Sequence, residues 1–206
     1  YICETPDAVP QVTPTSTPEV SPTPSQTAAV SRTPRPSRTP AHTPAPNKYK
    51  IIVDKADHAF SIFTYDANGE YTVKVATYPT ALGRSSRETP TGTFTISSKG
   101  AWKTWSSGTY SPFYTKYTSG LYFHGPIYTA KSGDALIPSS YEAIGTDASS
   151  GCMRTTVAGA RFIYYNCPSG TVVEIVTSSS LVSWPGKPPI DQNYPTWDPT
   201  DPDKPD

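Results

Sequence analysis

The chain has 206 residues, and its 17 basic and 17 acidic side chains give a formal net charge of zero. This balance excludes an overall field that would attract nucleic acid or an anionic membrane surface. No run of about 18 apolar residues occurs, so the sequence contains no predicted transmembrane segment. Of the 24 prolines, 11 fall in residues 1–48 and 7 in residues 184–206. This distribution predicts one globular domain, residues 49–183, between a disordered Pro/Thr/Ser-rich linker at 1–48 and a disordered, Pro-rich acidic tail at 184–206.

The predicted linker repeats Thr-Pro and Ser-Pro pairs, which favour polyproline II and cannot bury a core. A segment of this kind suits a stalk that holds a domain away from a membrane, or a spacer between modules. Cys3 is either the lipidated first residue of a surface lipoprotein or a free cysteine. The three cysteines Cys3, Cys152 and Cys167 are too few for a disulfide framework and lack metal-ligand spacing, so we expect no metal site.

Order is expected to begin near Tyr49, where short runs of β-branched and aromatic residues predict a mainly β domain. Strands are predicted at residues 50–54, 59–65, 71–77, 92–97, 121–124 and 171–176, the first three as an antiparallel meander with an Asn68-Gly69 turn. Residues 102–117 show no clear period and are expected to form a long loop, and residues 126–148 a connection with few apolar anchors. The pair Thr155-Thr156 can cap one short helix, which Pro168 stops.

Cys152 is the candidate nucleophile. It stands in Ser149-Ser150-Gly151-Cys152-Met153-Arg154, between a glycine and a polar turn, whereas a structural thiol usually stands in an apolar run. A free thiol is only a few per cent ionised at neutral pH, so it needs a base within hydrogen-bond reach. Of the three histidines, His42 lies in the linker and His58 near the start of a strand. His124, at the end of a strand and before Gly125-Pro126, is therefore the candidate base.

Five segments carry a resemblance to a known family: Ile51-Ile52-Val53, Glu88-Thr89-Pro90-Thr91-Gly92-Thr93-Phe94, Phe123-His124-Gly125, residues 149–154 and Gly170-Thr171-Val172-Val173-Glu174-Ile175. In order and spacing they resemble the L,D-transpeptidase catalytic domain family (YkuD type), bacterial enzymes that cross-link peptidoglycan. The resemblance covers roughly residues 49–177. It implies an L,D-transpeptidase-like β-sandwich with one short helix after the catalytic cysteine.

The resemblance also implies roles for the residues around the thiol. Cys152 would attack the carbonyl that joins the third residue of a tetrapeptide stem to its terminal D-Ala, while His124 takes the thiol proton. The side-chain amine of a neighbouring stem would then resolve the thioester. Backbone N–H groups of Gly151 and Cys152 would hold the oxyanion, and the carbonyl of Gly125 would orient the His124 ring.

Other side chains near the motif have two possible roles each. Ser149 either takes part in catalysis or forms the turn, and Ser150 either contacts substrate or forms the turn. Arg154 either binds a substrate carboxylate with its forked guanidinium or holds the loop through a structural ion pair. A set of aromatic residues either walls the substrate groove or packs in the core: Trp102, Trp105, Tyr110, Phe113, Tyr114 and Tyr122. Of these, Tyr122 is the candidate for substrate binding.

The chain departs from the family pattern in two places. Ser150 stands where the family usually has histidine, which bears on the tuning of the thiol. The 24 residues between His124 and Ser149 are a longer spacer than usual, and the surplus near residues 130–140 predicts an added loop beside the cleft. Two alternatives to cross-linking stay open: an L,D-carboxypeptidase that passes the thioester to water, and a catalytically inactive wall-binding domain.

The resemblance finally implies partners and a location. The partners would be peptidoglycan stem peptides, with carbapenems as acylating agents, and no cofactor is needed because the thiol carries the chemistry. The place of action would be extracytoplasmic, in the bacterial cell envelope, with the protein secreted or membrane-tethered through its N-terminal linker.

Overall fold

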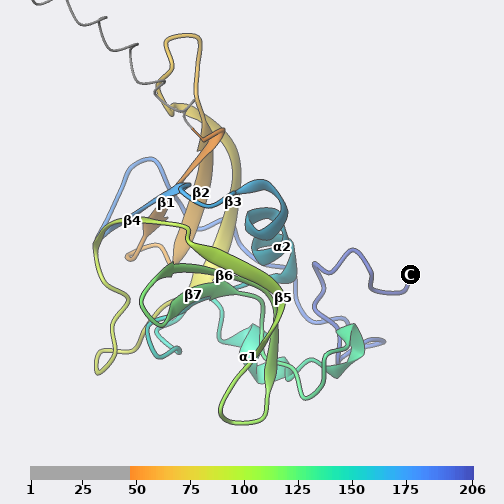
Figure 1. Cartoon of the computed structure of the whole chain (residues 1–206). Helices are drawn as coiled ribbons and strands as arrows, with labels where there is room; N and C mark the ends of the chain where they lie inside the picture. Colours follow the sequence, from red (N-terminus) through yellow and green to blue (C-terminus); the bar gives the residue numbers. More distant parts are fainter. Residues whose placement is uncertain (1–46) are drawn as a thin grey trace, which may run out of the picture. The chain divides into compact units, whose positions relative to one another are not determined.

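A computed structural model describes residues 47–206. The predicted linker at residues 1–48, with its Thr-Pro pairs and Cys3, lies outside this range except for its last two residues. Figure 1 shows a strongly curved sheet in the described part of the chain, with short helices packed beside it. Within residues 47–206, no helix is both long and apolar enough to cross a membrane.

Nine strands form one sheet in the order β4-β9-β1-β2-β3-β8-β7-β6-β5. β1, β2 and β3 are the predicted antiparallel meander, and β9 pairs in parallel with β1. The mainly β prediction is therefore confirmed. The strands are β1 (Tyr49–Asp54), β2 (Ala59–Thr64), β3 (Val73–Ala81), β4 (Gly92–Thr95), β5 (Ser98–Thr104), β6 (Tyr110–Thr118), β7 (Leu121–His124), β8 (Met153–Thr155) and β9 (Val172–Val176).

The sheet curls so that its two halves enclose one core, and β4 contacts β6 across it. Alternate residues of the strands point inward, as the two-residue period of a strand requires. Each inward-pointing apolar side chain that is fully buried contributes about 1.5–3 kcal/mol to the stability of the fold through the apolar surface it removes from water. The buried members of the core come from both halves of the sheet and include Ile51, Val53, Phe60, Ile62, Phe123, Met153, Val173 and Ile175.

The helix predicted after the cysteine is α2 (Val157–Asn166). The Thr156 side chain accepts a hydrogen bond from the N–H of Gly159 at 3.3 Å, which confirms the predicted cap. α2 packs against β6, and its Ile163 side chain is fully buried in the core. Cys167 follows the helix directly, and its thiol is also buried in the core rather than exposed to a ligand.

The long loop predicted at residues 102–117 is wrong, because most of this segment forms the hairpin of β5 and β6. Aromatic contacts cover both faces of the hairpin. Trp102 packs edge-on against Tyr128 with ring centroids 5.6 Å apart, whereas the ammonium of Lys103 lies 5.2 Å from the centre of the Tyr122 ring on the other face. Since neither face is purely polar, the two-residue alternation that would reveal the strands is hidden.

The connection at residues 126–148 has more apolar anchors than its sequence suggests. It contains a 3₁₀ turn, η1 (Gly133–Ala135), and a second short helix, α1 (Pro138–Glu142), so the prediction of a single helix is wrong. The turn and the start of α1 take up the surplus residues predicted near 130–140. A second small core lies here, formed by Tyr128, Leu136, Tyr141, Ile144 and Val157. These apolar residues are too unevenly spaced to show a helical period.

The C-terminal segment, residues 184–206, is not the disordered tail that its composition predicts. The Lys187 ammonium donates to three carbonyl oxygens at the end of α1, at 2.6–3.2 Å. The carboxylate of Asp198 is fully buried and accepts a hydrogen bond at 2.9 Å from the N–H of Val157, the first residue of α2. A few polar anchors of this kind order a proline-rich segment that has no periodic apolar face. The ordered domain therefore extends beyond residue 183.

Candidate active site

A cleft of about 140 Å³ brings together the two residues proposed to carry the chemistry. β7 ends with His124, and β8 begins directly after Cys152. The two strands pair in parallel, with Phe123 beside Met153 and His124 beside Arg154, so the cysteine lies level with Tyr122, two positions before His124 and on the same face of the sheet. The residues that line the cleft are Trp105, His124, Ile127, Ser149, Ser150, Cys152 and Arg154.

The imidazole of His124 is held in one orientation. It is buried, with 3% of its surface exposed, and its Nδ1 atom lies 2.6 Å from the carbonyl oxygen of Gly125. A carbonyl can only accept, so Nδ1 carries the hydrogen and Nε2 is left as an acceptor. Burial, and then the charge of Arg154, lower the pKa of His124 to about 3, although the hydrogen bond to Gly125 opposes this change. The ring is therefore neutral at physiological pH.

The Cys152 thiol is also uncharged at rest. Burial is the largest effect and raises its pKa above the ordinary value, because the thiolate loses hydration. Three groups act in the opposite direction and lower the pKa of the thiol: the backbone N–H of Tyr122, the guanidinium of Arg154 and the ammonium of Lys103. Burial prevails over them, so the resting site holds a neutral thiol and a neutral imidazole rather than an ion pair.

Gly151 adopts a backbone conformation that favours glycine, with φ at 102°. A Cβ atom at this position would come within 3.0 Å of Leu121 Cδ2. The carbonyl oxygen of Gly151 accepts hydrogen bonds from the hydroxyls of Thr89 and Tyr117, both at 3.1 Å. Two buried hydroxyls thus fix the peptide that immediately precedes Cys152.

Ser149 closes the turn that carries Cys152. Its hydroxyl donates to the carbonyl of Cys152 at 2.6 Å and accepts from the N–H of Gly151 at 3.1 Å. The N–H of Gly151, expected to hold the oxyanion, is therefore already bonded in this structure. The carbonyl of Ser149 in turn accepts from the backbone N–H and the Nε of Arg84, at 3.1 Å and 3.3 Å. Ser150 lines the cleft, and its hydroxyl accepts from the Arg84 guanidinium at 3.4 Å.

Arg154 reaches the cleft from β8, next to His124 in the parallel pairing. Its Nη1 donates to the carbonyl of Ser140 at 3.4 Å. Among residues 47–206, no carboxylate lies within ion-pair distance of it, so the structural ion pair is not found in the described part of the chain. Its Nε atom is buried without a hydrogen-bond partner in the same range. A charged donor with unused capacity thus faces the cleft.

The comparison with family models decides the classification. Residues 48–175 match the YkuD model, described as the L,D-transpeptidase catalytic domain. The chain belongs to this family. The match covers the whole curled sheet except the last residue of β9, and it includes both His124 and Cys152.

Solved structures of L,D-transpeptidases share the fold. LD transpeptidase LdtMt1 in complex with imipenem has 21% identity and a TM-score of 0.51, and the match covers 63% of this chain and 59% of that one. An L,D-transpeptidase from Mycobacterium smegmatis has 18% identity and a TM-score of 0.51, with 63% and 58% covered. A fused Zn-dependent amidase/peptidase/peptidoglycan-binding domain-containing protein from Clostridium acetobutylicum has 23% identity and a TM-score of 0.48, with 63% and 52% covered.

The likeness to the two L,D-transpeptidases shows the fold. The chain spans between about half and three fifths of the length of the three structures. No curated protein matches the chain.

The aromatic residues divide between the cleft and the core. Trp105 lines the cleft and packs edge-on against His124, with ring centroids 5.0 Å apart. Tyr122 packs edge-on against both Trp105 and Tyr114, at 6.0 Å and 5.8 Å. Lys103 lies over all three of these rings. The remaining three of the predicted set, Trp102, Tyr110 and Phe113, pack instead against the second small core.

Four residues that contact the site were given no role there from the sequence: Arg84, Thr89, Lys103 and Tyr117. Thr89 stands in a segment that carries the family resemblance, so the motif marked its neighbourhood but not its hydrogen bond to the cysteine loop. Nothing in the sequence marks the other three. Arg84 and Tyr117 bond residues of the cysteine loop more than thirty positions away. Lys103 lies over the rings of Trp105, Tyr114 and Tyr122, which only the fold brings together.

Proposed function

We propose that the chain is a peptidoglycan L,D-transpeptidase that works through a thioester on Cys152. The supporting observation is that the thiol and a neutral imidazole line one cleft, and that the Gly125 carbonyl leaves His124 Nε2 free to accept a proton. Nucleophilic catalysis by a thiol needs this pairing of nucleophile, base and orienting group.

In the first half-reaction, Cys152 Sγ attacks the carbonyl between the third stem residue and its terminal D-Ala. The thiol proton moves to Nε2 of His124 as the bond forms. When the tetrahedral intermediate collapses, the C–N bond breaks and the imidazolium gives its proton to the departing amine. General acid–base transfer of this kind contributes about 10²–10⁴-fold in rate. The products are free D-Ala and a thioester on Cys152.

In the second half-reaction, the side-chain amine of a neighbouring stem attacks the thioester carbonyl. His124 accepts a proton from the attacking nitrogen and returns it to the departing sulfur. The thiol is regenerated, and an amide bond joins the two stems. No redox change or cofactor enters either half-reaction.

The oxyanion of each tetrahedral intermediate needs a fixed donor. Because the N–H of Gly151 donates to the Ser149 hydroxyl, the N–H of Cys152 would be the donor that holds the oxyanion. One donor of this kind is worth about 10²–10³ in rate. Ser149 then acts as a positioning residue, since its hydroxyl bonds both sides of the turn that presents the cysteine.

Substrate binding is assigned to the charged and aromatic walls of the cleft. Arg154, with a buried Nε that has no partner in residues 47–206, can bind a substrate carboxylate. Tyr122 and Ser150 would contact the stem peptide from either side of the thiol. The site of action would be extracytoplasmic, in the bacterial cell envelope. Because LdtMt1 has been solved with imipenem, we further propose that carbapenems acylate Cys152.

Incubation with tetrapeptide-bearing muropeptides, followed by mass spectrometry, tests the proposal. Dimers with loss of D-Ala are expected. Trimmed tripeptides without dimers would indicate a carboxypeptidase, and unchanged substrate would indicate an inactive wall-binding domain. His124→Asn should abolish the dimers, whereas the matched control His58→Asn should not, because His58 pairs with Asp147 outside the cleft. Dimers formed by Cys152→Ala would refute the mechanism.

A further inference from the structure

A second cavity, of about 190 Å³, shares none of its lining residues with the catalytic cleft. Successive residues of a strand point to opposite faces of the sheet, so Trp102 on β5 faces this cavity while Lys103 faces the thiol side. The C-terminal segment supplies the opposite wall through Trp197. The lining residues are Ala101, Trp102, Pro112, Phe113, Tyr128, Gly133, Trp197, Asp201 and Asp203.

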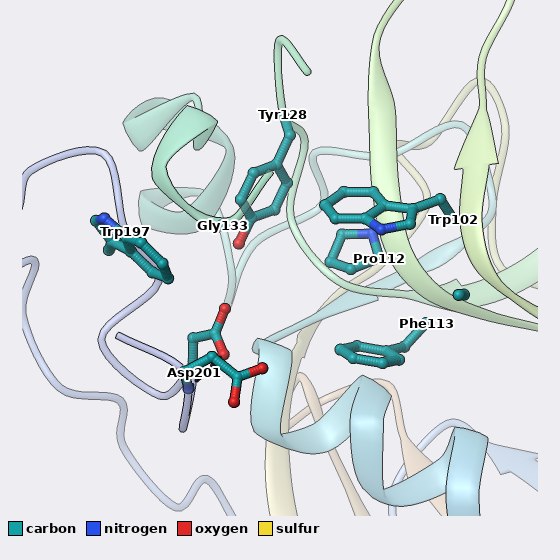
Figure 2. Close-up of a pocket in the computed structure, with 9 residues that line it drawn as sticks. Trp102, Pro112, Phe113, Tyr128, Gly133, Trp197 and Asp201 are labelled. Atoms are coloured by element: carbon teal, nitrogen blue, oxygen red, sulfur yellow. Dashed lines mark hydrogen bonds between the residues drawn. The ribbon is translucent and has the colours of Figure 1, made fainter. Parts of the chain in front are cut away.

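Four aromatic rings line the cavity, those of Trp102, Phe113, Tyr128 and Trp197, as Figure 2 shows. The face of an aromatic ring carries partial negative charge and attracts a cation that lies within about 6 Å of its centre. A ring also gives an aliphatic chain an apolar surface to lie on. The cavity is smaller than the range of roughly 300–1,000 Å³ typical for whole ligands. Its size suits a single side chain.

The polar groups in the cavity accept hydrogen bonds and carry negative charge. Asp201 and Asp203 line it, and within residues 47–206 the only ion pair that either of them makes joins Asp203 Oδ2 to Nη1 of Arg161, at 3.4 Å. One guanidinium does not balance two carboxylates. The cavity therefore favours a ligand group that brings positive charge and hydrogen-bond donors.

Tyr128 gives an independent sign that a ligand group is missing. Its side chain is fully buried, yet its hydroxyl has no hydrogen-bond partner among residues 47–206. In Figure 2 the hydroxyl end of the ring points toward Asp201 across the cavity. A buried polar atom without a partner costs about 1–3 kcal/mol, so a donor placed between Tyr128 and Asp201 would recover that free energy.

We propose that this cavity binds the primary ammonium group of an aliphatic peptide side chain, of the lysine type. The ammonium would donate to Asp201 and to the hydroxyl oxygen of Tyr128, while the methylene chain lies against Trp102 and Trp197. The site is separate from the acyl-transfer chemistry and does not depend on Cys152. Its ligand comes to the face of β5 and β6 that is turned away from the thiol.

The test uses the whole chain labelled with ¹⁵N at its four tryptophan indoles, each signal assigned by a Trp→Phe variant. Titration with N-acetyl-lysine methylamide should shift the signals of Trp102 and Trp197 and leave that of Trp105, in the catalytic cleft, in place. N-acetyl-norleucine methylamide, which keeps the aliphatic chain but lacks the charge, should bind roughly tenfold more weakly.

Two variants change the cavity in different ways. Asp201→Asn removes a charge but keeps the amide oxygen that accepts from the N–H of Asp203, and it should weaken binding roughly tenfold. Gly133→Ala places a Cβ atom against the Trp197 ring, closer than van der Waals contact allows, so it should block binding without removing a charge. Asp147→Asn, which alters a carboxylate outside the cavity, is the control and should bind normally.

Unchanged signals of Trp105 and Trp184, which lie outside the cavity, would show that the free variants are folded. The proposal is overturned if lysine amide shifts no indole signal, if only Trp105 shifts, or if the norleucine and lysine amides bind equally well.

Discussion

Alkylation of Cys152 by iodoacetamide should accelerate by about tenfold per pH unit between about pH 6 and 9, without a plateau. The reason is the burial of the thiol, which raises its pKa above the ordinary value of a cysteine despite the nearby Arg154 and Lys103. Only a small fraction of the thiol is therefore ionised at pH 7. Iodoacetamide is uncharged and reacts with the thiolate, so its rate follows that small fraction.

The assay follows the Cys152 peptide by mass spectrometry at each pH. Cys167 serves as an internal comparison, because it is buried and its pKa is raised to about 12, and it should stay unmodified. His124→Gln should leave the slope unchanged, since an imidazole with a pKa of about 3 is neutral over this whole range. A plateau in rate below pH 7 would instead reveal a resting thiolate–imidazolium pair and refute the neutral site described above.

Three further predictions concern the support of the site. Burial raises the Asp198 pKa to about 6 from 3.8, so the stability that the protonated carboxyl gives is lost as the pH rises. Relative to Asp198→Asn, wild type should lose about 2 kcal/mol of unfolding free energy between pH 4 and 7, measured by urea denaturation, and a pH-independent difference would contradict this. Gly151→Ala should cost about 1–2 kcal/mol through its positive φ and slow acylation, as thermal unfolding and adduct formation would reveal. Thr89→Val removes a donor to the Gly151 carbonyl and should destabilise by about 1–3 kcal/mol, and wild-type stability would refute that role.

The candidate pair, Cys152 and His124, could be picked out of the sequence because its signals are local. A cysteine after glycine, and a histidine at the end of a strand before Gly125-Pro126, are visible without any tertiary contact. The family resemblance also predicted the hydrogen bond from His124 to the Gly125 carbonyl, which the structure contains with an Nδ1–oxygen distance of 2.6 Å. The meander of β1 to β3 was equally accessible, since its strands are adjacent in sequence and joined by a turn with Asn68-Gly69.

The parts that could not be predicted depend on distant contacts. Aromatic residues on both faces of the β5–β6 hairpin remove the alternation by which a strand is recognised. The C-terminal segment looks like a linker in composition, but a buried Asp198 caps α2 from more than forty residues away. A high proline content predicts the absence of helix and sheet, but it does not predict whether side chains such as Asp198 anchor the segment to the domain.

The loop that carries the thiol is another case. Its turn residues are evident in the sequence, but the engagement of the Gly151 N–H by Ser149 is a matter of side-chain rotamer. From the motif alone, the N–H groups of both Gly151 and Cys152 were expected to hold the oxyanion. In the structure, the Gly151 N–H already donates to the Ser149 hydroxyl.

The most direct test of the central claim is the intact mass of the protein after brief incubation with a tetrapeptide stem and no acceptor. The account predicts an adduct on Cys152 equal to the stem minus D-Ala, absent from Cys152→Ala and removed when an amine acceptor is added. Release of D-Ala by the Cys152→Ala variant, or an adduct mapped to any other residue, would contradict it.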